Sequence, residues 1–152
     1  MTYTDDEKFM RLAIEQAQIA GRTGEVPIGA VITDKSGGIV SSGYNLRETA
    51  NDPTAHAEII AIKKAGGALG SWRLEGTTIF VTIEPCLMCV GAIILARISR
   101  LVFGARDPKA GAVVSVYTIG NDCRLNHKFE VSEGIYMDEC SNLIKDFFKT
   151  LR

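Results

Sequence analysis

The chain has 152 residues, of which 46% are hydrophobic and 23% are charged, and its formal net charge is -1. A chain of this length fits one domain, residues 1–152, and can bury about two-thirds of its unfolded surface without disulfide bonds. No apolar run reaches the ~20 residues of a transmembrane helix, so we expect no membrane partner. The charge argues against a strongly basic protein that wraps nucleic acid, and we expect no DNA partner.

A helix is predicted near the N-terminus. Thr4 and Glu7 have the spacing of a capping box, in which two side chains satisfy backbone N–H groups of the first turn. Gly21 and Gly24 are expected to end this helix. Small and aliphatic residues recur between these ends at helical spacing: Met10, Ala13, Ile14, Ala17 and Ala20. They define one apolar face, so we interpret this helix as scaffold.

A β-hairpin is predicted next. Residues 26–33 read as a strand, in which Gly29 indicates a close approach of the backbone to a ligand or to packed residues. A glycine-containing turn leads to a returning strand over residues 39–44. Asn45 follows at the strand end. An asparagine there is usually a turn residue, but beside a metal pocket it could bind a ligand.

Strands and apolar helices alternate in the middle of the chain. A helix is predicted from Pro53, with Asp52 as its N-cap, to about Ala65, where two glycines would stop it. Its core candidates are the isoleucines at 59, 60 and 62, and Trp72 after it is interpreted as a packing residue. A strand over residues 77–82 then leads into a second helix, which begins at Pro85, runs to Arg97 and is apolar on most sides.

The last third contains an irregular connection between two strands. A strand is predicted over residues 100–105 and a short one over 129–131, and the connection between them carries several basic residues. The final helix starts near Met137 and has an apolar stripe that suits either the core or a subunit contact. The alternation of strands and buried helices predicts an α/β layered sandwich with a mixed sheet.

Two short segments, residues 53–58 and 84–89, have the pattern of a metal site. His56, Cys86 and Cys89 can supply three zinc ligands and leave a fourth tetrahedral position for water, as in a catalytic zinc site. Glu58 is not needed as a ligand and is free to move protons. A His-x-Glu motif followed later by Pro-Cys-x-x-Cys is the signature of zinc nucleobase deaminases.

Both halves of this pattern fall at predicted helix starts. The positive end of a helix dipole lowers the pKa of a thiol such as Cys86 and favours the thiolate that zinc requires. Cys86 and Cys89 alone would also fit a redox pair, and a structural zinc would need a fourth ligand from Cys123, Cys140 or His127. The metal-type cysteine pair indicates a reducing compartment, which we expect to be the cytoplasm.

Beyond these motifs, the chain resembles the bacterial tRNA-specific adenosine deaminases of the cytidine-deaminase-like superfamily over nearly its whole length. The zinc motif alone would give only the superfamily, whereas the block from Gly104 to Gly111 and the pair Asn126-His127 point to the tRNA enzymes. The run from Ala112 to Ser115 is bulkier than the small, glycine-containing run of the family. The similar segments are residues 25–31, 52–58, 81–91, 97–98, 103–109, 125–127 and 139–148.

The resemblance implies both a fold and a function. The fold is a three-layer α/β/α sandwich with a mixed five-stranded sheet, in a homodimer with one Zn2+ per subunit. The activity is hydrolytic deamination of adenosine to inosine at the wobble position, with a tRNA anticodon stem-loop as partner. Asn45, Asp107 and Asn126 match positions around the flipped base or the neighbouring anticodon nucleotides. Phosphate contacts are expected from basic residues of the irregular connection: Arg106, Lys109, Arg124 and Lys128.

Other functions fit parts of the pattern. A deaminase of a free base or a nucleotide, such as a guanine or cytosine deaminase, would use the same zinc chemistry with a different pocket. A non-catalytic zinc-binding subunit that positions RNA would have no need of Glu58. A thiol redox protein would use Cys86 and Cys89, and it would be purified without metal.

Overall fold

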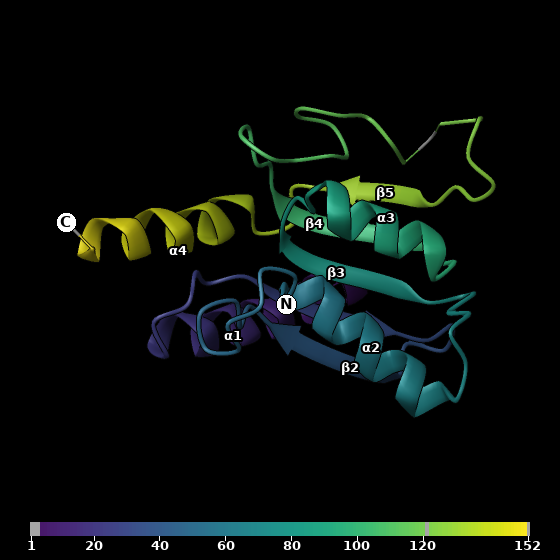
Figure 1. The fold of residues 1–152 in the computed structure, drawn as a ribbon, viewed down its shortest axis with the longest axis horizontal. Helices are drawn as coiled ribbons and strands as arrows, with labels where there is room; N and C mark the ends of the chain where they lie inside the picture. Colours follow the sequence, from purple (N-terminus) through teal and green to yellow (C-terminus); the bar gives the residue numbers. More distant parts are fainter. Residues whose placement is uncertain (1–3, 121, 152) are drawn as a thin grey trace.

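The computed structural model describes residues 4–120 and 122–151, which form four α-helices and one mixed five-stranded sheet (Figure 1). The strand order is β2-β1-β3-β4-β5. β1 is antiparallel to both of its neighbours, and β3, β4 and β5 are parallel. The helices are α1 (Asp5–Arg22), α2 (Ala57–Leu69), α3 (Leu87–Leu95) and α4 (Met137–Thr150). The strands are β1 (Gly29–Thr33), β2 (Ile39–Tyr44), β3 (Thr78–Ile83), β4 (Arg100–Ala105) and β5 (Glu130–Glu133).

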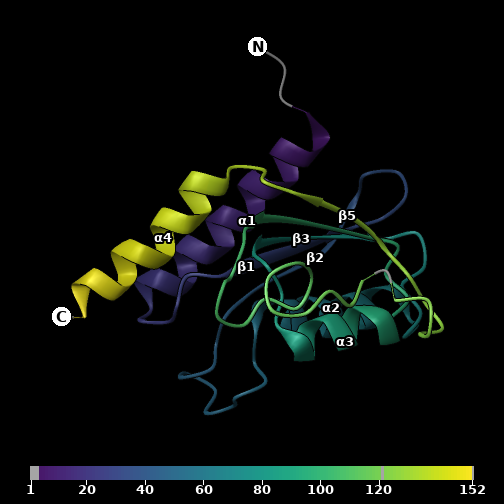
Figure 2. The same cartoon turned by 90° about the horizontal axis from the view of Figure 1, so that it is seen from above.

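Helices cover both faces of the sheet, which confirms the predicted three-layer sandwich. Figure 2 shows α1 and α4 side by side on one face and α2 and α3 on the other. Strand β3 alternates between two separate cores, because Val81 packs with the α2 and α3 layer and Phe80 with the α1 and α4 layer. No helix among residues 4–120 and 122–151 has the length and apolar character needed to cross a membrane.

Helix α1 lies directly on β1. Its predicted capping box is present, and all five residues of its predicted apolar face are buried. A Cβ atom at Gly29 would collide with the backbone of Ala13 and Ala17, so the close approach indicated by this glycine is packing, not ligand binding. The helix passes through Gly21 to Arg22. The residues from 26 to 28 stay outside β1, because the Ile28 N–H donates to the Val26 carbonyl instead of joining the sheet.

Helix α2 differs from the prediction in its end and in its buried face. It continues through the two glycines at 66 and 67, and Gly70 closes it with a φ of 65°. Alanines at 57, 61 and 65 are fully buried, whereas the predicted isoleucines at 59, 60 and 62 are only half-buried. A Cβ atom at Gly43 of β2 would collide with the Ala57 carbonyl, so α2 lies too close to the sheet for larger side chains.

Trp72, interpreted above as a packing residue, is not part of the buried core. The side chain is 62% exposed, and the Arg73 guanidinium lies over its ring, 4.8 Å from the ring centroid. Trp72 follows the end of α2 on the surface, where apolar character alone does not determine burial.

An ion pair joins the start of α1 to β4. Arg100 donates two hydrogen bonds to Asp6, of 2.8 and 2.7 Å, and this contact holds the pKa of Asp6 below its ordinary value. A lowered folded-state pKa contributes stability that is present above the unfolded-state value and is lost as the pH falls through the folded-state value.

Asp6→Asn should therefore lower the free energy of unfolding by about 1 kcal/mol at neutral pH. The difference from wild type should shrink as the pH falls below ~4, because the wild-type carboxylate then takes up a proton. Urea unfolding at several pH values measures this. Asp5→Asn is the matched control, since Asp5 is 88% exposed and lies 4.0 Å from its partner Lys8. If the loss of unfolding free energy in Asp6→Asn stays constant from pH 7 to pH 2.5, the stabilisation does not depend on the charge of Asp6, and the prediction is wrong.

Candidate active site

Three side chains that are distant in the sequence meet at one point. The Sγ atoms of Cys86 and Cys89 lie 3.6 and 3.5 Å from Nδ1 of His56. One ligand atom from each residue lies within 4.8 Å of the others, which is a spacing that one metal ion can bridge. An imidazole nitrogen and two sulfurs are usual zinc ligands, so the donor set fits this metal. The structure brings together the trio predicted from the sequence.

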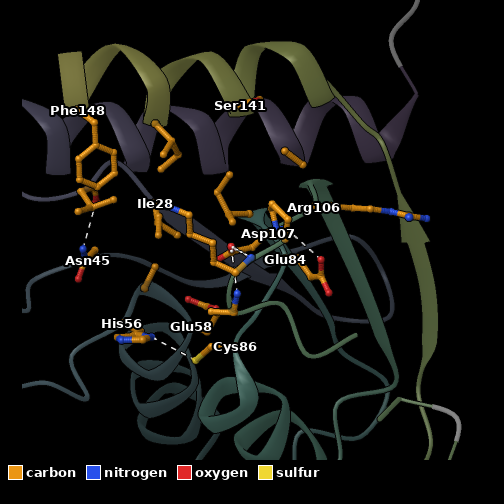
Figure 3. Close-up of a pocket in the computed structure, with 18 of the residues that line it drawn as sticks. Ile28, Asn45, His56, Glu58, Glu84, Cys86, Arg106, Asp107, Ser141 and Phe148 are labelled. Atoms are coloured by element: carbon orange, nitrogen blue, oxygen red, sulfur yellow. Dashed lines mark hydrogen bonds between the residues drawn. The ribbon is translucent and has the colours of Figure 1, made fainter. Parts of the chain in front are cut away.

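His56 is the N-cap of α2, where the prediction had placed it inside the opening turns. Asp52 does not cap this helix, because its Oδ1 accepts hydrogen bonds from the Thr54 N–H and hydroxyl and forms a separate turn. Helix α2 consequently begins at Ala57. The cap position still points the imidazole toward the two cysteines, as Figure 3 shows for Cys86.

Strand β3 and helix α3 place the two sulfurs. Cys86 is the N-cap of α3, and Cys89 follows in its first turn, fully buried. Hydrogen bonds from Cys89 and from His56 lower the pKa of Cys86 to about 4. The contact with Cys86, together with burial, raises the pKa of Cys89 above its ordinary value. A divalent cation beside both sulfurs would allow the second thiol to ionise as well.

Glu58 lies in the first turn of α2, and its side chain lies beside Cys86 of the metal cluster (Figure 3). The residue is only 4% exposed. Burial raises the pKa of this carboxyl above its ordinary value, so a proton is easier to hold there than on a surface glutamate. A carboxyl group of this kind suits general acid and base catalysis.

His56 and Cys86 of the cluster, together with Glu58, line a pocket with a volume of about 620 Å³. Two of the three predicted substrate-binding residues line it. Asn45 is 3% exposed, donates to the Val26 carbonyl over 3.3 Å and accepts from the Arg47 N–H. Asp107 accepts hydrogen bonds from the N–H groups of Lys109 and Ala110. Asn126 is exposed and does not line this pocket, so the structure does not bring it to the other two.

Two of the basic residues expected to contact phosphate are already paired with acidic side chains. Arg106 lines the pocket, but its guanidinium is bound to Glu133 on β5 through contacts of 2.7 and 3.2 Å and points away from the metal cluster (Figure 3). Arg124 is paired with Asp122 at 2.6 Å. Lys109 lines the pocket. These pairings make the cationic surface smaller than the sequence indicated.

Two parts of the site were not found by sequence reasoning. Helix α4 forms a wall of the pocket, although its apolar stripe had been assigned to the core or a subunit contact; its lining residues are Ser141, Ile144, Lys145 and Phe148. The other part is Glu84, a 3% exposed carboxylate that accepts hydrogen bonds from the connection after β4. Burial raises its pKa, but hydrogen bonds from Ser115, Val114 and Asp107 outweigh this and leave the pKa below its ordinary value. A charged residue at the end of an apolar strand was the available signal, because such a group requires partners.

The chain is similar to known deaminases in sequence and in fold. The family model of the cytidine and deoxycytidylate deaminase zinc-binding region matches residues 3–105. A tRNA-specific adenosine deaminase of Bacillus subtilis (strain 168) is 46% identical over 149 residues, which are 98% of this chain and 92% of the relative. A solved structure from a study of A-to-I editing by tRNA:A34 deaminases at the wobble position of transfer RNA is 43% identical. It covers 90% of this chain and 98% of its own, with a TM-score of 0.86.

A more distant similarity is to the X-ray structure of guanine deaminase from Bacillus subtilis. It is 39% identical and covers 70% of this chain and 66% of its own, with a TM-score of 0.63. The region that the family model matches includes all three clustered ligands and Glu58, so zinc is the cofactor of this site. The chain belongs to the tRNA-specific adenosine deaminases, within the wider group that shares the cytidine and deoxycytidylate deaminase zinc-binding region.

Proposed function

We propose that this chain deaminates adenosine to inosine at the wobble position of a tRNA anticodon. The observation that carries the proposal is the buried Glu58 beside a cluster of His56, Cys86 and Cys89, in which Glu58, His56 and Cys86 line one pocket. The family adds the substrate, because the relatives that match nearly the whole chain are tRNA-specific adenosine deaminases.

Metal binding and proton transfer are assigned to different residues of the site. His56, Cys86 and Cys89 would hold one zinc ion per subunit. Zinc held by three protein ligands lowers the pKa of water at the site, to about 7 in favourable cases, and thereby supplies a nucleophile at neutral pH.

Glu58 moves the protons. Its carboxylate oxygen accepts the proton of the attacking water and donates a proton to N1 of the adenine, which makes C6 more electrophilic. The carboxylate then takes the remaining proton of the hydroxyl group added at C6 and passes it to the departing amino group, so that ammonia leaves and the C6 carbonyl of inosine forms. Because the residue is 4% exposed, few solvent molecules compete for these transfers.

Asn45 and Asp107 are assigned to the flipped base, since both line the pocket above the cluster. Asn126 is assigned to an RNA contact outside the pocket, because it is exposed and lies apart from the lining. An adenine inside a duplex is out of reach of such a pocket, whereas an unpaired loop base can be turned outward and enter.

An RNA substrate also agrees with the charges around the opening. Arg47, Lys109 and Lys145 line the pocket, and Lys149 extends the same surface along α4. Phosphate groups on either side of the flipped nucleotide would meet these cations, so binding should weaken as salt is raised.

A homodimer in the cytoplasm is part of the same proposal. Large apolar side chains are exposed on α3, after α2 and in the connection between β4 and β5: Leu87, Leu95, Trp72, Val116 and Tyr117. A second copy of the chain would cover them. Light scattering after size exclusion should give a mass of two chains, and a single-chain mass at micromolar concentration would refute the dimer. The thiolates that zinc requires persist in a reducing compartment, which agrees with the cytoplasm.

A substrate panel tests the proposal. Zinc-loaded protein is incubated with an anticodon stem-loop that carries adenosine at the wobble position and, separately, with free adenosine, cytidine and guanine. We expect inosine only in the RNA. The guanine deaminase similarity makes guanine the leading alternative. Turnover of guanine without reaction of the RNA would keep the zinc site and overturn the substrate.

A further inference from the structure

We propose that Glu84 is a positioning residue whose buried carboxylate fixes the wall of the substrate pocket after β4 and thereby controls how tightly the substrate is held. The proposal rests on the proposed function only for the identity of the substrate. The contacts that carry it lie within the chain.

Glu84 binds two parts of one connection. Its Oε2 accepts hydrogen bonds from the N–H groups of Val113, Val114 and Ser115, of 3.0, 2.9 and 3.0 Å. Its Oε1 accepts from the Asp107 N–H over 3.0 Å and from the Ser115 hydroxyl. Successive N–H groups that converge on one oxygen form an anion-binding nest, and here the anion is a side chain of the same protein.

These hydrogen bonds connect the wall of the pocket to the segment that carries the metal ligand Cys86. Glu84 precedes Cys86 by two residues, and the Ala112 N–H donates to the Pro85 carbonyl over 2.9 Å. Gly111 pairs with Cys86 in an isolated β-bridge, and a Cβ atom at Gly111 would collide with the Glu84 carboxyl. The lining residues from 105 to 110 therefore lie between a fixed end of β4 and a clamped segment over residues 111–115.

The contacts of Glu84 with residues 107 and 113–115, which we call the clamp, come mostly from backbone N–H groups. Only N–H groups and one hydroxyl contact the carboxylate, so the valine side chains do not enter the nest. Burial of a carboxylate costs free energy because the charge loses its hydration, so stability alone does not account for a charged group at this position. Its position beside the metal ligands gives the wall a fixed distance from the reacting base.

Glu84→Gln tests the proposal, because it keeps the size of the side chain and replaces one acceptor oxygen with an N–H donor. We expect normal zinc content and at least about tenfold faster hydrogen exchange at the amides of Asp107 and Val113–Ser115. With the anticodon stem-loop, KM should rise by about tenfold while kcat changes by less than about threefold, since the metal and Glu58 remain in place. Glu25→Gln is the matched control. It alters a carboxylate that is 1% exposed and binds Glu48 and Thr49 instead, so exchange over residues 107–115 should stay at the wild-type rate.

Unchanged exchange at these amides in zinc-replete Glu84→Gln would overturn the clamp. Faster exchange with an unchanged KM, or with a loss confined to kcat, would overturn its role in holding substrate. If Glu84→Gln does not fold, Ser115→Ala is the second test, since it removes only the hydroxyl contact. It should speed amide exchange and raise KM, each by a smaller factor. If the wild type does not act on RNA, the exchange measurement still tests the clamp, and KM is taken for whichever free base reacts.

Discussion

Glu58→Gln should retain its zinc and lose about a thousandfold or more in kcat. The substitution keeps the shape of the side chain but removes the group that accepts and returns protons. Glu58 is not part of the metal-ligand cluster, so metal content should not change. Metal analysis and single-turnover formation of inosine, measured on the same preparation, separate the two effects.

Glu15→Gln is the control for this experiment, because Glu15 is an exposed residue of α1 that does not line the pocket. It should have wild-type activity. A zinc-replete Glu58→Gln protein that retains a tenth or more of the wild-type rate would show that another group moves the protons.

Cys89→Ala should be purified without stoichiometric zinc and should have no measurable deaminase activity. Removal of one sulfur leaves two protein ligands, which do not hold a catalytic zinc ion. Cys89 is fully buried, so its truncation also leaves a small cavity and lowers stability. The loss of metal therefore has to be separated from the loss of packing.

Cys140→Ala provides that separation. Cys140 is equally buried, but it lies on α4 and packs against the glycine at position 104 of β4, outside the metal cluster. It should lose a similar amount of packing and still bind one zinc ion and remain active. Stoichiometric zinc in Cys89→Ala, or loss of zinc in Cys140→Ala, would contradict the ligand assignment.

The fold was largely predictable because its elements follow local patterns. The face of α1 was identified from spacing alone, and the alternation of strands and helices indicated the layers. The errors occurred where a local hydrogen bond or a close contact decided the outcome. Asp52 forms its own turn with Thr54 and so delays the start of α2. Helix α2 lies so close to Gly43 of β2 that its buried positions hold alanines. Helical periodicity does not reveal this close approach.

The site was predictable in its metal ligands and less so in its walls. The spacing of His56, Cys86 and Cys89 within their motifs is a property of the sequence, and the structure brings the three together. The partners of Arg106 and Glu84 lie 23 to 31 residues away along the chain, so their pairing depends on the tertiary fold. The same holds for α4, whose apolar stripe has the same periodicity whether it lines a core, an interface or a pocket.

The direct test of the proposed activity is the position of inosine in a stem-loop with adenosine at the wobble position and at one other unpaired loop position. After reaction with zinc-loaded wild-type protein, inosine is read as an A-to-G change on reverse transcription, and released ammonia is measured in parallel. We expect inosine at the wobble position alone, with an equal amount of ammonia. An unchanged stem-loop, together with deamination of free guanine or another free base, would contradict the proposed activity.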